Sequence, residues 1–138
     1  MEKVSDDNRC FACGKENPIG LKLEFNTEED YTVSTLNFRN DFAGWENMVH
    51  GGILSTVLDE VMVKSAGING FKCVTGELTV RYKSPCITGK DYKLRGKVTG
   101  INKRLVFTEG EIVDIDGKII ASGTGKMFVV EQLNKEDK

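Results

Sequence analysis

Gly51-Gly-Ile-Leu-Ser-Thr-Val-Leu-Asp-Glu-Val-Met-Val-Lys-Ser-Ala66 is the stretch of this 138-residue chain in which apolar residues recur at helical spacing. At about 100° per residue, its main apolar side chains cover roughly half of the helix circumference. A helix this apolar needs to be enclosed by other elements. The side chains concerned are Ile53, Leu54, Val57, Leu58, Val61 and Met62.

Strand patterns fill most of the remaining sequence, because apolar and polar residues alternate along it. Asp116-Gly117 is expected to form a two-residue hairpin turn between the last two strands. Together the patterns predict an α+β fold, with a curved antiparallel sheet of about six strands wrapped around one long central helix. The expected strands lie near 21–25, 31–38, 78–83, 92–98, 105–115 and 118–130.

Glycines recur within or beside the expected strands, where they often mark bulges, bends or close backbone approach. They suit long strands that must curl over a helix. These glycines are Gly76, Gly96, Gly100, Gly110, Gly123 and Gly125.

The length of the chain is typical of one domain. Residues 1–20 carry turn formers and little periodicity, so we expect an N-terminal arm or covering loop there. The main domain is expected over residues 21–131, and residues 132–138 read as a polar tail.

Charge and composition argue against several classes of protein. The chain carries 19 basic and 21 acidic side chains, well mixed, which is not typical of a nucleic-acid-binding protein. The N-terminus has no apolar signal-peptide core, and no apolar run is long enough to cross a membrane. We therefore expect a cytoplasmic protein with reduced thiols and no membrane or nucleic-acid partner.

Cys10-Phe-Ala-Cys13 is a C-x-x-C pair, followed by residues that read as a loop. Such a pair supplies two of the four ligands that a structural zinc site normally needs. Cys73 and Cys86 lie singly on expected strands, and His50 is the only histidine. We expect no metal and two thiols packed in the N-terminal loop, with a zinc site as the alternative.

The start of the expected helix has the features of an anion site. His50, Gly51 and Gly52 stand where backbone N–H groups lack intrahelical partners and the helix dipole adds positive charge. Two glycines also let another molecule approach the backbone closely. These features favour an oxyanion hole. The alternative is a simple helix-starting turn with His50 as a local cap.

Asp59 is the most interesting carboxylate of the helix. Its neighbour Glu60 has Lys64 at i+4, which is a common exposed ion pair, whereas Asp59 has no cation three or four residues away. Asp59 points away from the apolar stripe, either into solvent or toward a second subunit. An unpaired carboxylate in a partly desolvated groove has a raised pKa, which suits a general base.

Three motifs in combination resemble the hotdog-fold acyl-CoA thioesterases, especially the branch of the phenylacetate-pathway enzymes and their mitochondrial relatives. The first is His50-Gly51-Gly52 with a carboxylate nine residues after the histidine, at Asp59. The second is Thr75-Gly-Glu-Leu-Thr-Val-Arg-Tyr-Lys-Ser-Pro85, which is similar to the family strand after the helix. The third is Cys10-Phe-Ala-Cys13-Gly14 with Asn17-Pro18-Ile19-Gly20-Leu21.

The resemblance implies hydrolysis of an acyl-CoA thioester to the free acid and coenzyme A. Asp59 would act as general base or nucleophile, and Gly52 would donate its N–H to the carbonyl oxygen, with Gly51 contributing. His50 would orient the loop or the thioester, and Thr75 would place the attacking water. The sites would be shared between the protomers of a homodimer, or of a tetramer built from such dimers. No cofactor is implied beyond the coenzyme A of the substrate.

One position departs from the family pattern. Many members carry Asn or Gln six residues before the histidine, where this chain has Gly44; Asn47 stands only three residues before it. Trp45 is expected to contact substrate, together with Phe42, Met48 and Phe71, unless these side chains belong to the core. The coenzyme A phosphates would meet basic residues near strand ends, whose alternative role is exposed charge: Arg81, Lys83, Lys103 and Arg104.

Proteins of the same fold have two other functions to consider, a hydratase and a non-catalytic binding module. Hydratases of this fold pair the aspartate with a histidine a few residues later, and no histidine follows Asp59. A non-catalytic acyl-CoA binding module is the alternative to the thioesterase.

Overall fold

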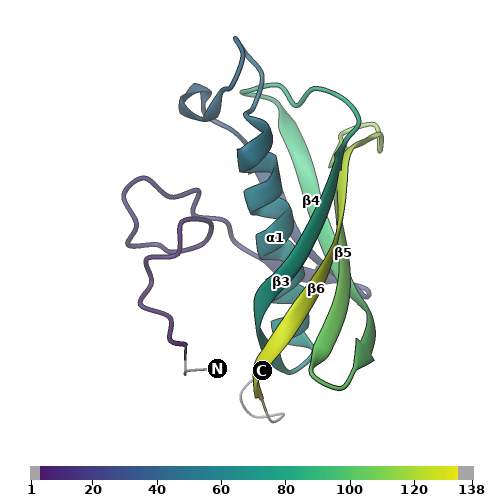
Figure 1. The fold of residues 1–138 in the computed structure, drawn as a ribbon. Helices are drawn as coiled ribbons and strands as arrows, with labels where there is room; N and C mark the ends of the chain where they lie inside the picture. Colours follow the sequence, from purple (N-terminus) through teal and green to yellow (C-terminus); the bar gives the residue numbers. More distant parts are fainter. Residues whose placement is uncertain (1–3, 134–138) are drawn as a thin grey trace.

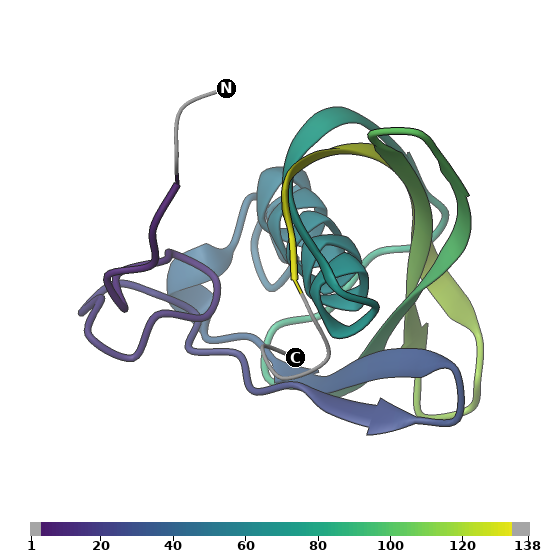
Figure 2. The ribbon, with the colours of Figure 1, turned by 90° about the horizontal axis from the view of Figure 1, so that it is seen from below.

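One helix lies in the curve of a six-stranded antiparallel sheet in the computed structural model of this chain, which describes residues 4–133 (Figure 1). The strand order is β1-β2-β4-β5-β6-β3, so β1 and β3 are the edges. Seen from below, the strands curl around the helix (Figure 2). The elements are β1 (Asn26–Glu28), β2 (Tyr31–Asn37), η1 (Asn40–Phe42), α1 (Gly51–Ile68), β3 (Phe71–Tyr82), β4 (Asp91–Asn102), β5 (Leu105–Asp114) and β6 (Ile119–Gln132).

The apolar stripe of α1 forms the centre of the core, as its spacing predicts. Val57, Leu58, Val61 and Met62 are completely buried, and Ile53 is partly buried against the same cluster. The helix ends where the Asn69 N–H donates to the carbonyls of its last turn. The predicted α+β arrangement of one central helix and a curved sheet is confirmed.

A row of glycines lets α1 pack directly on the sheet backbone. Gly96 of β4 lies opposite Gly110 of β5, which lies opposite Gly123 of β6. A Cβ atom at Gly96 would stand 2.9 Å from Val61 Cγ1, and one at Gly110 would stand 3.2 Å from the same atom. Both distances are shorter than comfortable carbon contacts. These two glycines therefore serve close approach of the helix.

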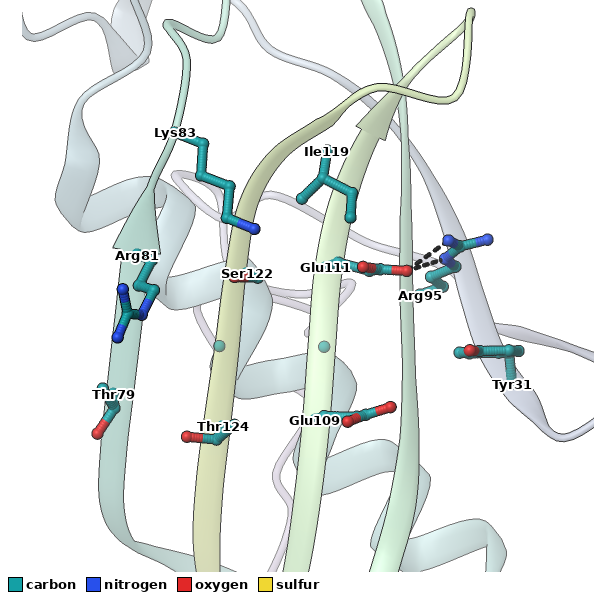
Figure 3. A pocket seen from close by; sticks show the side chains of 12 residues that line it. Tyr31, Thr79, Arg81, Lys83, Arg95, Glu109, Glu111, Ile119, Ser122 and Thr124 are labelled. Carbon is teal, nitrogen blue, oxygen red and sulfur yellow. Dashed lines mark hydrogen bonds and ion pairs between the residues drawn. The ribbon is translucent and has the colours of Figure 1, made fainter.

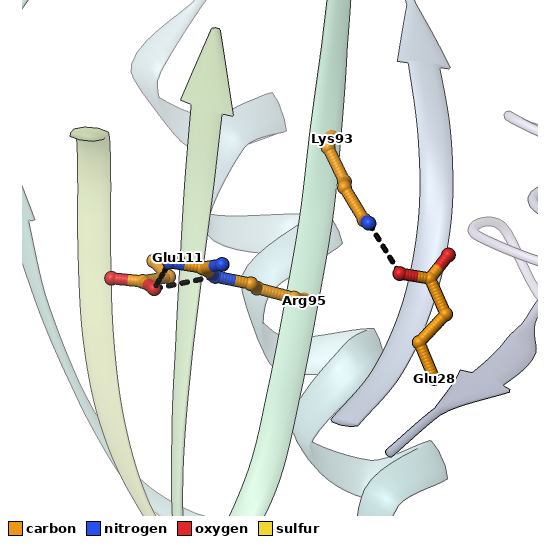
Figure 4. A network of polar contacts seen from close by, with 4 residues as sticks. All are labelled: Glu28, Lys93, Arg95 and Glu111. Atoms are coloured by element: carbon orange, nitrogen blue, oxygen red, sulfur yellow. Dashed lines mark hydrogen bonds and ion pairs between the residues drawn. The ribbon is translucent and has the colours of Figure 1, made fainter. Parts of the chain in front are cut away.

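The outer face of the sheet is polar and carries cross-strand ion pairs. Lys93 Nζ donates to Glu28 Oε1 at 2.5 Å, and Arg95 Nε donates to Glu111 Oε1 at 2.6 Å (Figure 4). Pairs on an exposed surface contribute little to stability, so the helix-facing side dominates the energetics of the fold.

The structure corrects several details of the predicted elements. The strand expected near 78–83 already begins at Phe71, and the short strand β1 was not expected. Residues 21–25 are not a strand: the N–H groups of Leu21 and Leu23 donate to carbonyls of the N-terminal arm, while their side chains pack on the core. The last hairpin has a three-residue loop, because the Asp114 N–H donates to Lys118 O and Gly117 adopts φ +86°. A three-residue loop with glycine in the left-handed region is a common alternative to the two-residue turn.

At both ends, the structure describes part of the segments expected outside the domain. Residues 4–25 contain no helix or strand. Strand β6 extends to Gln132, one residue further than the expected domain boundary. The rest of the expected polar tail, after Leu133, lies outside the described residues.

Candidate active site

The start of α1 is capped by the side chain of His50. Its backbone is extended, with φ −59° and ψ 135°, and its Nδ1 accepts a hydrogen bond from the Gly52 N–H at 2.9 Å. The local-cap alternative is therefore realised, and the Gly52 N–H is occupied. In the described part of the chain, the Gly51 N–H has no hydrogen-bond partner. Gly51, rather than Gly52, offers the free donor at the helix N-terminus.

A cavity of about 580 Å³ opens beside this helix start. Its walls are mostly apolar, and Trp45, which is 80% exposed, stands at its rim. Of the predicted site residues, Trp45, His50, Gly51 and Lys83 line it, whereas Asn47 does not. The full lining is Gly44, Trp45, Met48, Val49, His50, Gly51, Leu54, Tyr82, Lys83, Ser84, Pro85 and Cys86.

Tyr82 also lines this cavity and was not predicted from the sequence. Its ring lies 3.5 Å from the place where a Cβ of Gly51 would stand, and its hydroxyl is hydrogen-bonded to Ser55 Oγ. The signal was present in the sequence, because Leu78, Val80 and Tyr82 alternate and so share the inner face of β3. Of the suggested acyl-pocket residues, Met48 lines the cavity, whereas Phe42 and Phe71 pack against the core.

Asp59 and Thr75 form a second polar centre, further along α1. The Thr75 hydroxyl donates to Asp59 Oδ1 at 2.5 Å. Burial raises the pKa of the Asp59 carboxyl; the hydrogen bond from Thr75 lowers it, and the charge of Glu60 raises it further. A carboxylate with a raised pKa and a fixed hydroxyl neighbour has the properties of a general base beside a water-binding group.

Within one chain, the two centres are separate. Gly51 and Asp59 are eight residues apart on α1, which corresponds to about 12 Å along the helix axis. Each centre contacts the same strand, however, since Tyr82 lies at Gly51 and Thr75 lies at Asp59. That strand, β3, is an edge of the sheet. Both centres are therefore arranged along an edge of the sheet that has no neighbouring strand among residues 4–133.

Gly44 stands six residues before His50, where many members of the resembled family carry Asn or Gln. A Cβ at Gly44 would stand 3.2 Å from His50 Cα, so a larger side chain there would press on the capping histidine. Asn47 adopts φ +60°, and its carbonyl accepts from the Thr88 N–H. Asparagine tolerates this left-handed conformation well. The backbone of Asn47 thus shapes the loop.

The four basic residues proposed for coenzyme A lie in different places. Arg81 and Lys83 face a groove of about 320 Å³ on the outer side of the sheet, where neither pairs with Glu109 or Glu111 (Figure 3). Only Lys83 also reaches the cavity at the helix start. Lys103 and Arg104 form the turn between β4 and β5, at the end of the sheet near the C-terminus of α1.

The structure brings a third group to the C-x-x-C pair. The sulfur atoms of Cys10 and Cys13 and a carboxylate oxygen of Glu60 all lie within 4.8 Å of one another. Cys10 Sγ donates to Glu60 Oε2 at 3.4 Å, so the expected surface pair of Glu60 with Lys64 is not formed among the described residues. Burial, followed by the Glu60 carboxylate, raises the pKa of Cys13 to about 12.

Comparison with known proteins identifies the family of this chain. The sequence pattern of the Thioesterase superfamily matches residues 46–121, which include α1, β3, β4 and β5, and the chain belongs to that superfamily. The hotdog resemblance is thereby confirmed at the level of the superfamily, while the branch within it stays a prediction. None of the helices in the described part of the chain is long and apolar enough to span a membrane.

The chain is similar to an uncharacterised protein of Schizosaccharomyces pombe, with 30% identity over 103 residues, or 70% of this chain and 59% of that one. It is also similar to the crystal structure of the thioesterase superfamily protein RHA08564, with 26% identity, a TM-score of 0.83, and coverage of 88% and 63%. The chain thus spans about three fifths of the length of both proteins.

A third similar structure is a hypothetical thioesterase from Streptococcus pneumoniae with coenzyme A, at 20% identity and a TM-score of 0.75, covering 81% of this chain and 88% of that one. Structures of a hypothetical thioesterase from the same organism include variants that replace one aspartate or one threonine by alanine. At this level of identity the likeness confirms the shared fold.

Proposed function

We propose that this protein hydrolyses an acyl-CoA thioester to a free acid and coenzyme A, at sites shared between two copies of the chain. The observation that carries the proposal is the Asp59 carboxylate, half-buried, bonded to Thr75 and placed beside the free edge strand β3. The coenzyme A in the similar structure from Streptococcus pneumoniae supports the class of substrate. The aspartate and threonine replaced there are as far apart in sequence as Asp59 and Thr75.

In the reaction, the Asp59 carboxylate takes a proton from water, and the water oxygen attacks the thioester carbonyl carbon. The alternative role of Asp59 is direct attack, followed by hydrolysis of the resulting anhydride. In both routes the carbonyl oxygen gains negative charge, and the Gly51 N–H at the positive end of α1 stabilises it. The C–S bond then breaks, and coenzyme A leaves as a thiolate that takes up a proton.

The edge strand supplies a physical reason for a shared site. Unpaired N–H and C=O groups of a long edge strand favour pairing with another strand, and β3 has 12 residues. Two copies of β3 would pair antiparallel about a two-fold axis. Gly76 is the extra residue of a bulge between Thr75 and Glu77. Suppose that the two-fold axis passes at Thr79. Tyr82 then lies three positions from the axis on one strand, and Thr75 lies three paired positions from it on the other, because the bulge residue Gly76 is not counted. Tyr82 would therefore lie opposite the partner's Thr75.

That register brings the two polar centres together. Tyr82 lies beside Gly51, and Thr75 is hydrogen-bonded to Asp59. Placing Tyr82 opposite Thr75 therefore brings the Gly51 N–H of one protomer to the Asp59 carboxylate of the other. Both side chains lie on the inner face of β3, which the pairing preserves. The 12 Å separation within one chain is thus replaced by a contact across the dimer.

The test is a thiol-release assay on the full chain with a panel of acyl-CoA thioesters, from acetyl to aromatic and long-chain. Wild type is expected to release coenzyme A from at least one of them. Asp59→Asn is expected to lose roughly 100- to 10,000-fold in turnover, which is the usual range for a general base. Retained turnover in Asp59→Asn would remove this residue from the mechanism.

Gly51→Pro tests the oxyanion donor. Proline is well tolerated at the first residue of a helix and lacks only the N–H, and His50 already has the extended backbone that must precede proline. We expect a loss of about 100- to 1,000-fold in turnover, whereas the matched control Gly51→Ala keeps the N–H and most activity. Tight acyl-CoA binding without thiol release in wild type would instead identify a binding module.

A further inference from the structure

The N-terminal arm places two sulfur atoms and one carboxylate together on α1, in a cluster that the thioesterase reaction does not use. Cys10 and Cys13 belong to the arm, and Glu60 lies in the middle of the helix. Figures 1 and 2 both show the arm beside α1, on the other side of the helix from β5. The three potential ligand atoms lie within 4.8 Å of one another although the arm and the helix are about 50 residues apart in sequence.

The loop that carries the two cysteines is closely built. The Gly14 N–H donates to Cys10 O at 2.8 Å, closing a tight turn around the pair. A Cβ at Gly14 would stand 2.4 Å from Cys10 N and 2.5 Å from Asn8 O, so only glycine fits there. The N–H groups of Leu21 and Leu23 fasten the other side of the loop to Phe11 and Ala12. Both thiols are therefore held on the side that faces Glu60.

We propose that Cys10, Cys13 and Glu60 bind a zinc ion, or a divalent ion of similar softness, with water as the fourth ligand. Tetrahedral zinc with bonds of about 2.3 Å to sulfur places two thiolates roughly 3.8 Å apart, so shifts of about an ångström or less complete the site. Two thiolates select against Mg²⁺ and Ca²⁺, which prefer oxygen ligands only. On binding, the thiol protons pass to solvent.

The sequence analysis expected no metal, because it found only the two cysteines as ligands. The structure adds the Glu60 carboxylate as a third potential ligand. A C-x-x-C pair alone is two ligands short of a zinc site. The positive charge of Lys64, which acts on Cys13, partly offsets the net negative charge of two thiolates and a carboxylate on a divalent ion. Bound metal would fasten the arm to α1. The proposal does not depend on thioester hydrolysis, since neither Asp59 nor Gly51 belongs to the cluster.

The test is a titration of the reduced full chain with Co²⁺, followed by its thiolate-to-cobalt absorption in the near ultraviolet. Wild type is expected to show this band, saturating at one ion per chain, and Zn²⁺ is expected to abolish it and to raise the thermal unfolding midpoint. Cys13→Ser should lose the band, and Glu60→Gln should weaken Co²⁺ binding at least tenfold. Cys73→Ala, which alters a buried thiol on β3, is the control that should keep it.

Two results would overturn the proposal. One is a reduced, folded wild type that shows no such band. The other is a band of undiminished strength in both Cys13→Ser and Glu60→Gln, which would place the bound ion elsewhere. Circular dichroism of each variant establishes that the chain is folded before the titration. Because Glu60→Gln preserves side-chain size, it keeps the test valid if a cysteine variant unfolds.

Discussion

Replacing Thr79 by cysteine tests the dimer through its register. If two copies of β3 pair with Thr79 at the two-fold axis, this residue lies directly opposite its own copy. Directly opposite residues of antiparallel strands have Cα atoms about 4.5–5.5 Å apart, which a disulfide spans without distortion. Thr79 lies on the exposed outer face of β3, where an oxidant reaches it (Figure 3).

Arg81→Cys is the matched control, on the same exposed face two residues further along. Its two copies would be four residues apart along the paired strands, or about 14 Å, which exceeds the roughly 7 Å limit for a disulfide. After mild oxidation, Thr79→Cys should run on a non-reducing gel at twice the 15.3 kDa chain mass, and Arg81→Cys should not. Equal cross-linking of both variants, or a monomer in light scattering, would refute the register.

Two further predictions concern stability. Gly96→Ala places a Cβ 2.9 Å from Val61 Cγ1, and overpacking of this kind should cost about 1–3 kcal/mol of unfolding free energy in urea titration; Gly67→Ala, which meets open space, should cost nothing. Asp59→Asn should stabilise the protein at neutral pH, because a raised pKa means that ionisation of Asp59 opposes folding. The gain in stability should be absent below the ordinary aspartate pKa of about 3.9. It should grow as the pH rises toward the raised pKa of Asp59 and stay constant above that pKa. A destabilised Asp59→Asn at pH 7 would contradict this prediction.

Local patterns carried most of the fold. The 3.6-residue spacing from Ile53 to Met62 depends only on neighbours along the chain, and so does the alternation in β3 to β6. The alternation of apolar and polar residues around Leu21 and Leu23 wrongly predicted a strand. An extended segment that packs on a core without joining the sheet shows the same alternation. Its backbone partners are Phe11 and Ala12, which no short window of sequence reveals.

The site was less predictable because it depends on side-chain placement. The family resemblance implied roles for Asp59 and Thr75, and the structure adds that the two side chains are hydrogen-bonded. That His50 would occupy the Gly52 N–H depends on a side-chain rotamer, which spacing does not determine. The approach of Glu60 to the cysteine pair was not predicted, because Lys64 at i+4 offered an apparent local partner. The position of the arm is set by contacts remote in sequence.

The sharing of each site by two protomers is open to direct test by mixing inactive chains. Asp59→Asn and Gly51→Pro are each expected to be inactive alone, but a mixed dimer would contain one site with both an intact carboxylate and an intact donor N–H. Equal mixing after unfolding and refolding together should restore about a quarter of the wild-type thioesterase turnover, since half of the dimers are mixed and each has one working site. Turnover that stays at the level of the separate variants would show that Asp59 and Gly51 do not meet across the dimer.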